Sequence, residues 1–238
     1  MIQLHYYPSN ASMIPHIVLE ELGVPFELVL VDRSQNLHKS ADYLKLNPNG
    51  KIPTLVETNP GQPDLVLYEG AAICLHLADT HPQAHLMPPV GSAARAHAYK
   101  WLLWLSNTFQ PDIMMFYYPE RYVASGDPQV VRGVSEQAQL RIQGHLAQLD
   151  DELGRASSAV TTRSRATEDI DDTGTWFLGQ NYSVLDPYVF TLCRWTRGFT
   201  SHPARSFETN LAPYLQRMLA RAAVQRVIAT EKLQAPYL

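Results

Sequence analysis

The sequence has few cysteines. Only Cys74 and Cys193 occur among 238 residues, and each lies among apolar residues in a helix-like stretch. Two such residues do not make a disulfide framework, and a free cysteine behaves as a small buried hydrophobe. We therefore expect two reduced core cysteines and no disulfide-based fold.

The sequence also lacks an excess of positive charge and a long apolar run. Its net charge is -4, without the concentrated basic face that nucleic-acid binding needs. No window approaches the roughly 18 to 20 apolar residues that span a bilayer, and the first residues, MIQLHYYP, lack the pattern of a targeting signal. We expect a cytoplasmic protein with no metal, no nucleic-acid partner and no membrane partner.

Residues 1–82 show the pattern of an α/β domain. Strands are predicted at 3–7 and 26–32, and the apolar helix between them ends at Gly23. A strand, a helix and a strand in this order place the two strands parallel. Two further strands, 52–57 and 65–69, flank TNPGQPD, whose proline and glycine indicate a hairpin loop, and a helix follows over 69–79.

The rest of the chain is predicted to be helical. After a linker at 83–92, an aromatic helix is predicted over about 94–118 and an amphipathic one from 128. Residues 154–175 are polar and without periodicity, which indicates a mobile surface loop. Within YSVLDPYVFTLCRW, Ser183 and Asp186 have the spacing of a helix capping box. The second domain is therefore predicted over 93–238.

Five stretches, in this order, resemble the cytosolic glutathione transferases, most closely the bacterial beta class: YYPSNASMIPHIVLEELG, NPNGKIPTL, LYEGAAICLHLAD, FLGQNYSVLDPYVFTLCRW and RAAVQRV. The resemblance implies a thioredoxin-like α/β N-terminal domain with a mixed four-stranded sheet, followed by an all-α helical-bundle domain. It also implies a cytoplasmic homodimer that acts in detoxification with reduced glutathione as co-substrate.

The resemblance also implies a glutathione site in the first domain. Proline cannot donate to a sheet ladder, so Pro53 at the start of a strand is unusual. In this family its counterpart follows a cis peptide, and the N–H and C=O of the preceding residue, here Ile52, pair with the cysteinyl backbone of glutathione. An ordinary trans edge proline is the alternative.

Other residues at matching places would hold the two ends of glutathione. Glu69 corresponds to the acidic residue that holds the γ-glutamyl amine, and the N–H of Gly70 would receive the γ-glutamyl carboxylate, although most of the family has serine there. Lys51, His38 and Lys39 are candidates for the glycyl carboxylate, with solvated surface positions as the alternative.

The sequence differs from the beta class at the residue that activates the thiol: Ala11 occupies the position of the beta-class cysteine. Ser12 is the first candidate for a hydroxyl donor to the sulfur, with a helix N-cap as its alternative role. Asn10 is the second candidate, through its side-chain amide, and Tyr6 is the third.

The electrophile site is expected between the two domains, lined by the long aromatic helix. The polar residues that the beta class directs toward the thiol correspond here to Leu103, Gln110 and Pro111, so that support is largely lost. The aromatic and sulfur-containing candidates for this lining, which are core residues in the alternative reading, are Trp104, Met114, Phe116, Tyr117 and Tyr118.

The leading hypothesis is an enzyme that adds the thiolate of glutathione to small hydrophobic electrophiles. The alternative is a noncatalytic glutathione-transferase-like protein that binds ligands, which Ala11, Gly70 and Pro111 favour somewhat. A glutathione-dependent reductase or peroxidase would need a site cysteine, which the resemblance does not provide here.

Overall fold

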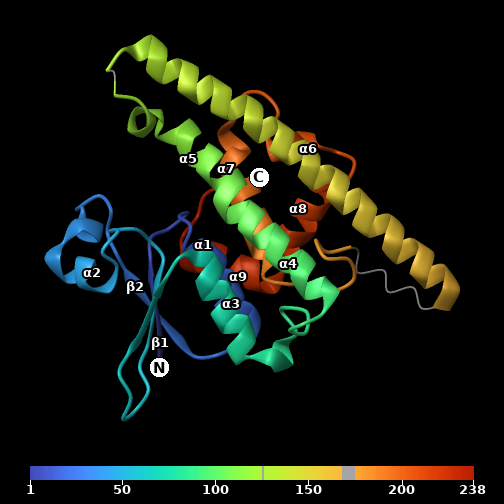
Figure 1. Ribbon diagram of the computed structural model, residues 1–238, viewed down its shortest axis with the longest axis horizontal. Helices are drawn as coiled ribbons and strands as arrows, with labels where there is room; N and C mark the ends of the chain where they lie inside the picture. Colours follow the sequence, from blue (N-terminus) through green and yellow to red (C-terminus); the bar gives the residue numbers. More distant parts are fainter. Residues whose placement is uncertain (125, 168–174) are drawn as a thin grey trace. The chain divides into compact units, whose positions relative to one another are not determined.

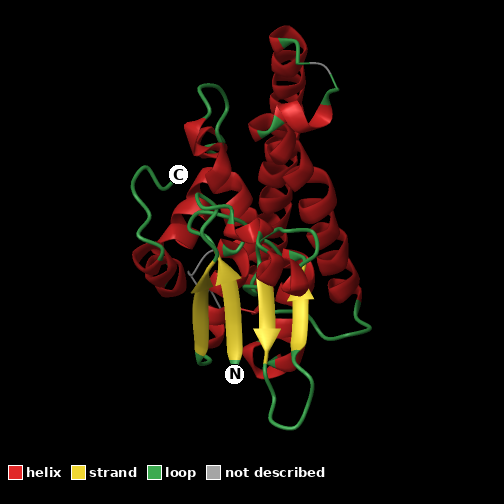
Figure 2. Cartoon of the chain, turned by 90° about the vertical axis from the view of Figure 1, so that its left-hand side faces the viewer, coloured by secondary structure: helices red, strands yellow, loops and turns green. Residues whose placement is uncertain are grey.

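Four short strands form one mixed sheet in the order β2-β1-β3-β4 (Figure 2). The computed structural model describes residues 1–124, 126–167 and 175–238, and these fall into two units that are each described by themselves. The first unit, residues 1–87 with 219–235, holds β1 (Ile2–Tyr6), α1 (Met13–Leu22), β2 (Phe26–Leu30), α2 (Ala41–Leu46), β3 (Thr54–Glu57), β4 (Leu65–Tyr68), α3 (Gly70–Thr80) and α9 (Ala222–Thr230).

The parallel pair of β1 and β2 and the hairpin of β3 and β4 are as the sequence predicts, and the pairing of β1 with β3 is added by the structure. β1 runs parallel to β2, and β3 is antiparallel to both β1 and β4. His5 pairs with Thr54, and Thr54 pairs with Tyr68, so the ends of three strands lie level with one another. The expected α/β fold of the first domain is confirmed.

Helices cover both faces of this sheet. α1 packs against α3 on one face, and α2 lies on the other (Figure 1). α1 buries its first seven residues and ends at Gly23, which adopts the left-handed conformation at φ 65° and donates its N–H to Leu19. Glycine adopts this conformation without a side-chain clash, which explains the predicted stop.

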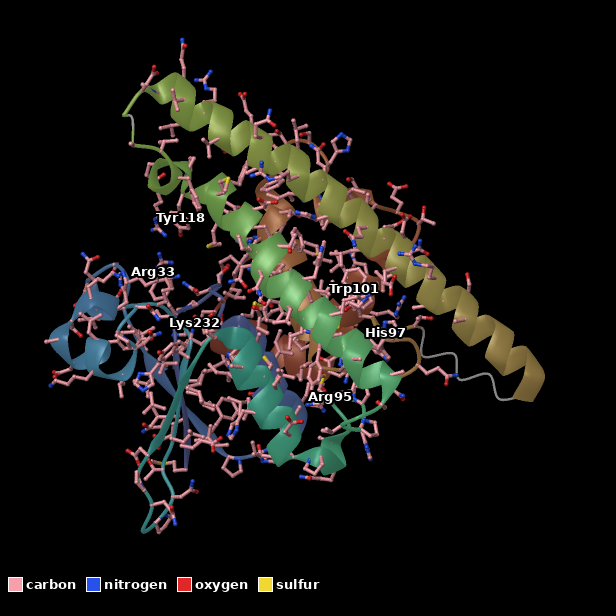
Figure 3. All side chains as sticks on the ribbon, in the orientation of Figure 1. Arg33, Arg95, His97, Trp101, Tyr118 and Lys232 are labelled. Atoms are coloured by element: carbon pink, nitrogen blue, oxygen red, sulfur yellow. The ribbon has the colours of Figure 1, made fainter. Side chains whose placement is uncertain are left out.

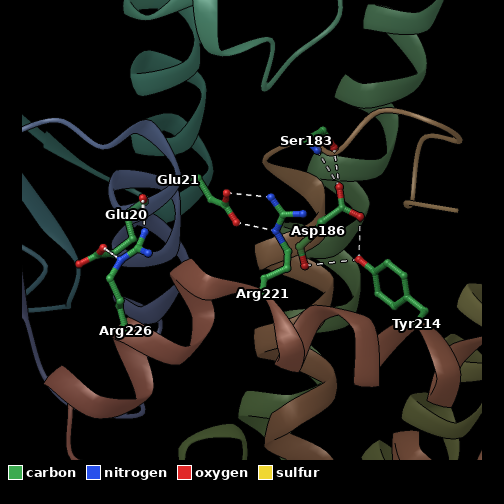
Figure 4. Close-up of polar contacts among 7 residues, drawn as sticks. All are labelled: Glu20, Glu21, Ser183, Asp186, Tyr214, Arg221 and Arg226. Carbon is green, nitrogen blue, oxygen red and sulfur yellow. Dashed lines mark hydrogen bonds and ion pairs between the residues drawn. The ribbon is translucent and has the colours of Figure 1, made fainter. Parts of the chain in front are cut away.

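The last helix of the chain, α9, belongs to the first unit. Arg221 binds Glu21 through two bonds of 2.6 and 2.8 Å, and Arg226 binds Glu20 at 2.5 Å (Figure 4). From the sequence, residues 219–235 were expected in the helical domain. Local periodicity identifies a helix but does not identify the surface against which it packs.

The second unit is helical, as predicted. It holds α4 (Ala93–Trp104), a π-helical segment (Leu105–Phe109), α5 (Gln110–Tyr117), α6 (Pro128–Thr167), α7 (Leu185–Trp195) and α8 (Leu211–Ala220), the last of which ends just beyond it. The apolar face predicted for α6 is buried from Ala138 to Leu153, and none of the described helices is long and apolar enough to cross a membrane.

The predicted loop at 154–175 is wrong over its first part. α6 continues to Thr167, while residues 168–174 lie outside the described residues. Apolar periodicity indicates that a helix has a buried face, but a helix can also form without such a face. Alanine and arginine, both frequent in this stretch, are strong helix formers.

The start of α7 is organised by Asp186, which is fully buried (Figure 4). Its carboxylate accepts the N–H of Ser183 at 2.8 Å, as the predicted capping box requires, and the Ser183 hydroxyl at 3.1 Å. The N–H of Phe177 and the hydroxyl of Tyr214, each at 2.8 Å, add two donors that spacing does not reveal. Burial raises the pKa of Asp186 from 3.8 to about 6, against the opposite effect of these hydrogen bonds.

Candidate functional site

Three predicted site segments meet at one end of the sheet. β1 ends at Tyr6, β3 begins at Thr54 and β4 ends at Tyr68, and the pairing register holds these positions level. The segments that continue from them contain Asn10 and Ser12, Ile52 and Pro53, and Glu69 and Gly70. Sheet topology therefore gathers residues that lie up to 60 positions apart.

Ile52 presents a free pair of backbone groups at this end. The Ile52–Pro53 peptide is cis, as the resemblance implies. Among the described residues, neither the N–H nor the C=O of Ile52 has a hydrogen-bond partner. An extended peptide can pair with such a donor and acceptor as if it were one more strand.

The peptide group before Ile52 is held by buried side chains. The carbonyl of Lys51 accepts the Tyr43 hydroxyl at 2.6 Å and the Asn47 amide at 2.9 Å, and Thr54 Oγ1 lies 2.9 Å from the Tyr43 oxygen. Burial raises the pKa of Tyr43. These contacts were missed from the sequence, although Asn47 and Thr54 both lie in the NPNGKIPTL stretch.

A basic cluster lies beside the same peptide segment. Lys51 is exposed, and Lys39 reaches the carbonyl of Asn49 at 3.4 Å from the short helix Leu37–Lys39. Gly50, at φ 58°, permits this approach, since a Cβ there would lie 2.8 Å from both the His38 carbonyl and Lys39 Nζ. The structure thus brings the segment of His38 and Lys39 beside the segment that carries Lys51.

Glu69 precedes α3 in a strained conformation. Its φ of 72° and ψ of 110° are uncommon for a residue other than glycine, and such residues gather at ligand sites. Its side chain is exposed and makes no cap contact. In the first turn of α3, the N–H groups of Gly70, Ala71 and Ala72 have no acceptor among the described residues, which favours an anion there.

Ser12 does not present its hydroxyl to the site. The side chain is fully buried, donates to the carbonyl of Tyr7 at 3.1 Å and accepts the N–H of Tyr7 at 3.2 Å. Ser12 occupies the N-cap position of α1, and its carbonyl accepts the His16 N–H at 3.0 Å, but its side chain makes no capping hydrogen bond. Since the single hydroxyl proton is already used, this geometry weighs against Ser12 as the thiol donor.

Asn10 has the opposite arrangement. Its side-chain oxygen accepts the N–H of Ala11 at 2.6 Å, which fixes the orientation of the amide. Among the described residues, the amide nitrogen has no partner, and the side chain is half-buried. Asn10 therefore retains two N–H donors beside the end of β1.

Tyr6 lies near a buried pair of hydrogen-bonded side chains. Glu231, at the end of α9, accepts the N–H of Ser9 at 2.8 Å and pairs with His16 at 2.9 Å, and both side chains of that pair are fully buried. Burial and then the charge of Glu231 raise the pKa of Tyr6. This contact between the loop and residue 231 was not found from the sequence, because no local motif indicates it.

Arg33 adds a further cation close to this loop. It follows β2, and its guanidinium carbon lies 6.0 Å from the centroid of the Tyr7 ring (Figure 3). Tyr7 packs against a buried cluster that contains Tyr43 and Ile52. The Tyr7 ring thus contacts both Arg33 and the cluster that contains Ile52.

The cysteines take no part in this end of the sheet. Cys74 and Cys193 are free and buried, as predicted. Burial raises the pKa of both thiols far above the usual value, so neither forms a thiolate at neutral pH. The described residues contain no cluster of histidine, cysteine and acidic side chains suited to hold a metal.

The five aromatic and sulfur-containing candidates of the second unit do not form one group. Trp104 packs with Trp101, at 5.2 Å between ring centroids, and with His145, also at 5.2 Å. Phe116 instead stacks on Phe199 at 4.3 Å, and the hydroxyl of Tyr117 donates to the carbonyl of Trp195. Trp104 is therefore a partly buried member of a different aromatic group from Phe116 and Tyr117.

The remaining candidates lie toward the end of α5. Met114 is half-buried, and Tyr118 is half-buried with the Arg121 guanidinium 3.9 Å from its ring centroid. Gln110, which aligns with one of the polar residues of the beta class, accepts a hydrogen bond from the Tyr188 hydroxyl at 2.8 Å. Leu103 is 56% exposed and provides no polar group.

Comparison with known proteins relates this chain to the glutathione transferases. A family model described as the glutathione S-transferase N-terminal domain matches residues 8–80, which include Asn10, Ile52 and Glu69. Glutathione S-transferase GstA of Escherichia coli O157:H7 is 29% identical over 98% of this chain and all of its own length. The chain is similar to glutathione transferases over nearly its whole length.

Solved structures of glutathione transferases match nearly the whole chain. The beta-class enzyme of Sphingomonas chungbukensis has a TM-score of 0.72 at 26% identity. A sphingomonad glutathione S-transferase complexed with glutathione has a TM-score of 0.71, also at 26% identity. Each match covers 98% of this chain and 100% of the other, which confirms the predicted resemblance to the beta class.

Proposed function

We propose that this protein is a glutathione transferase, which binds reduced glutathione at the end of its sheet and adds the thiolate to small hydrophobic electrophiles. The observation that carries the proposal is the free N–H and C=O of Ile52, placed between Asn10 and Glu69. The cysteinyl residue of glutathione has a complementary C=O and N–H. The similar structure that contains bound glutathione supports the same co-substrate here.

The γ-glutamyl end would bind at α3. Its ammonium group would pair with the exposed carboxylate of Glu69, and its carboxylate would accept N–H groups of the first turn, beginning with Gly70. The glycine leaves this second interaction to the backbone alone. A charged hydrogen bond contributes about 1.5–3 kcal/mol, so both contacts matter for affinity.

The glycyl carboxylate would bind the basic cluster. Lys39 and Lys51 are exposed residues on two segments that meet at Gly50, and His38 precedes Lys39 in the first of these segments. The two ends of glutathione would thus be held by opposite charges on either side of Ile52. This arrangement would fix the sulfur near the loop at the end of β1.

Asn10 is the proposed donor to the sulfur. A thiol pKa of about 8.5 must fall by roughly two units for half-ionisation near neutral pH, which needs about 2.7 kcal/mol. One hydrogen bond to the charged sulfur supplies about 1.5–3 kcal/mol. Asn10 has a donor available for it, whereas the Ser12 proton is bound to Tyr7. Tyr6 remains the other hydroxyl candidate.

The electrophile would contact apolar side chains of α5. Met114, Phe116, Tyr117 and Tyr118, which are consecutive or nearly so at the end of α5, are the proposed contacts, and Trp104 is left out because it lies at the end of α4. We further propose a cytoplasmic homodimer that acts in detoxification, on the strength of the family resemblance.

A noncatalytic ligand-binding protein is the second candidate. Ala11 in place of the beta-class cysteine and the absence of a free hydroxyl at Ser12 favour it. The two functions are separated by the ultraviolet absorbance of the thiolate in the glutathione complex, titrated from pH 5 to pH 10. A depressed thiol pKa with turnover of a chloronitrobenzene supports the transferase, and binding with an unshifted pKa and no turnover supports the second candidate.

A further inference from the structure

The carbonyl of Lys51 is held by two buried donors. Tyr43 is 5% exposed and Asn47 is 1% exposed, and both side chains reach the same oxygen from α2 and from the residue that ends it. A third side chain, Thr54, is fully buried beside them. Burying several polar groups around one backbone atom costs free energy unless each group has a hydrogen-bond partner.

Donor and acceptor roles in this cluster can be assigned. Asn47 Oδ1 accepts the N–H of Asn49 at 3.1 Å, so the other side-chain atom is the donating nitrogen. A carbonyl can only accept, so the Tyr43 proton goes to Lys51. Thr54 must then donate to the Tyr43 oxygen, 2.9 Å away, and it accepts from Asn47 at 3.4 Å. The bonds form a directed chain that ends on the Lys51 carbonyl.

This carbonyl shares a peptide plane with the free N–H of Ile52. The Lys51–Ile52 bond is not among the cis peptides, so its C=O and N–H point in opposite directions. Two hydrogen bonds on the oxygen fix the direction of the N–H. They also draw electron density toward the oxygen, which makes the N–H a stronger donor, since linked hydrogen bonds polarise one another.

We propose that Tyr43 and Asn47, supported by Thr54, are positioning residues that aim and polarise the Ile52 N–H for the cysteinyl carbonyl of glutathione. The inference rests on the proposed function, because it assigns a role within the same binding site. It adds a specific expectation, that buried groups which never touch glutathione set its affinity.

The test is Tyr43→Phe, which removes the hydroxyl and keeps the ring. Its matched control is Asp42→Asn, the neighbouring position of α2, whose side chain is 92% exposed. We expect the KM and the calorimetric Kd for reduced glutathione to rise about tenfold in Tyr43→Phe, with kcat unchanged, since one hydrogen bond near 1.4 kcal/mol is a factor of ten. Asp42→Asn should retain both constants.

Thr54 provides a rescue comparison. Thr54→Ser keeps the hydroxyl and should bind glutathione as the wild type does, whereas Thr54→Val should weaken binding in the same direction as Tyr43→Phe. A role limited to stability would lower the melting temperature and leave KM unchanged. That result in Tyr43→Phe would overturn the proposal.

A measurement without glutathione separates this proposal from the proposed function. In the free protein, Tyr43→Phe should move the amide proton of Ile52 upfield in nuclear magnetic resonance spectra, and Asp42→Asn should not. If the wild type fails to bind glutathione, the proposed function is wrong. If the Ile52 resonance is unmoved, the positioning role is wrong whatever the binding result.

Discussion

At the scale of single residues, the chemistry depends on which group meets the sulfur of glutathione. Asn10→Ala should raise the pKa of the bound thiol by about 1–2 units, because one charged hydrogen bond of about 1.5–3 kcal/mol is lost. The thiolate fraction at pH 7 then falls, so the pH profile of kcat/KM shifts to higher pH. Glutathione affinity should change little, since Asn10 is not among the proposed backbone and end-group contacts.

The control for Asn10 is Ser12→Ala. This variant should lower the free energy of unfolding by about 1–3 kcal/mol, because the N–H and C=O of Tyr7 lose a buried partner, and it should leave the thiol pKa unchanged. Absorbance titration of the thiolate and urea unfolding measure the two effects. The reverse pattern, a raised thiol pKa in Ser12→Ala alone, would restore the serine hypothesis.

Residue identity was easier to predict than residue orientation. The motifs identify Ile52, Glu69 and the loop around Asn10, and the structure brings these positions to one end of the sheet. The engagement of the Ser12 hydroxyl by Tyr7 depends on a turn whose geometry no residue spacing specifies. Candidate residue types can therefore be read from sequence, whereas free donors cannot.

At the scale of elements, the start of α7 should respond to pH through Asp186. Its pKa is raised from 3.8 to about 6, so the folded state binds more protons than the unfolded state between these values. The contribution of Asp186 to the free energy of unfolding is therefore lost as pH rises from about 4 to 6. At 1.36 kcal/mol per pKa unit, the loss is at most about 3 kcal/mol.

Asp186→Asn isolates that contribution. Urea unfolding of both proteins from pH 4.5 to 7.5 should show the unfolding free energy of the wild type falling relative to that of the variant, which cannot titrate at this position. Parallel profiles would mean that the four donors around the carboxylate offset the cost of burial completely.

A second element, the end of α9, holds the loop that carries Asn10. Glu231→Gln leaves the Ser9 N–H or His16 with a poorer acceptor inside a buried site, so the free energy of unfolding should fall by about 1–3 kcal/mol. Hydrogen exchange of the Ser9 amide should become faster. Mass spectrometry of exchanged peptides that cover the loop measures this directly.

Glu20→Gln is the control on the same helix pair. Its partner Arg226 is half exposed, and exposed ion pairs contribute only about 0–1 kcal/mol. The variant should leave the exchange of the Ser9 amide unchanged. Equal acceleration in both variants would show that α9 acts through general packing and that Glu231 has no specific role.

At the scale of the whole molecule, the first unit depends on the end of the chain. Val224, Val227 and Ile228 of α9 are buried, and burial of each such side chain contributes about 1.5–3 kcal/mol. A fragment of residues 1–87 should therefore be unfolded, and its circular dichroism should show no cooperative urea transition. A cooperative transition in the fragment would contradict this dependence.

The family resemblance predicted the two-part fold but assigned α9 to the helical part. Order along the chain predicts neighbours well when connections are short, as for β1, α1 and β2. It does not predict that residues 219–235 return to residues 1–87. The continuation of α6 to Thr167 was missed for a related reason, since a helix can continue where the sequence shows no apolar pattern.

The most direct test of the account is calorimetric titration of reduced glutathione into the wild type and into Glu69→Gln. We expect saturable binding by the wild type, with a Kd between micromolar and millimolar. Binding by the variant should be at least tenfold weaker, because the charge that holds the γ-glutamyl amine is lost. Absence of binding by the wild type, or equal binding by both proteins, would contradict the proposed glutathione site.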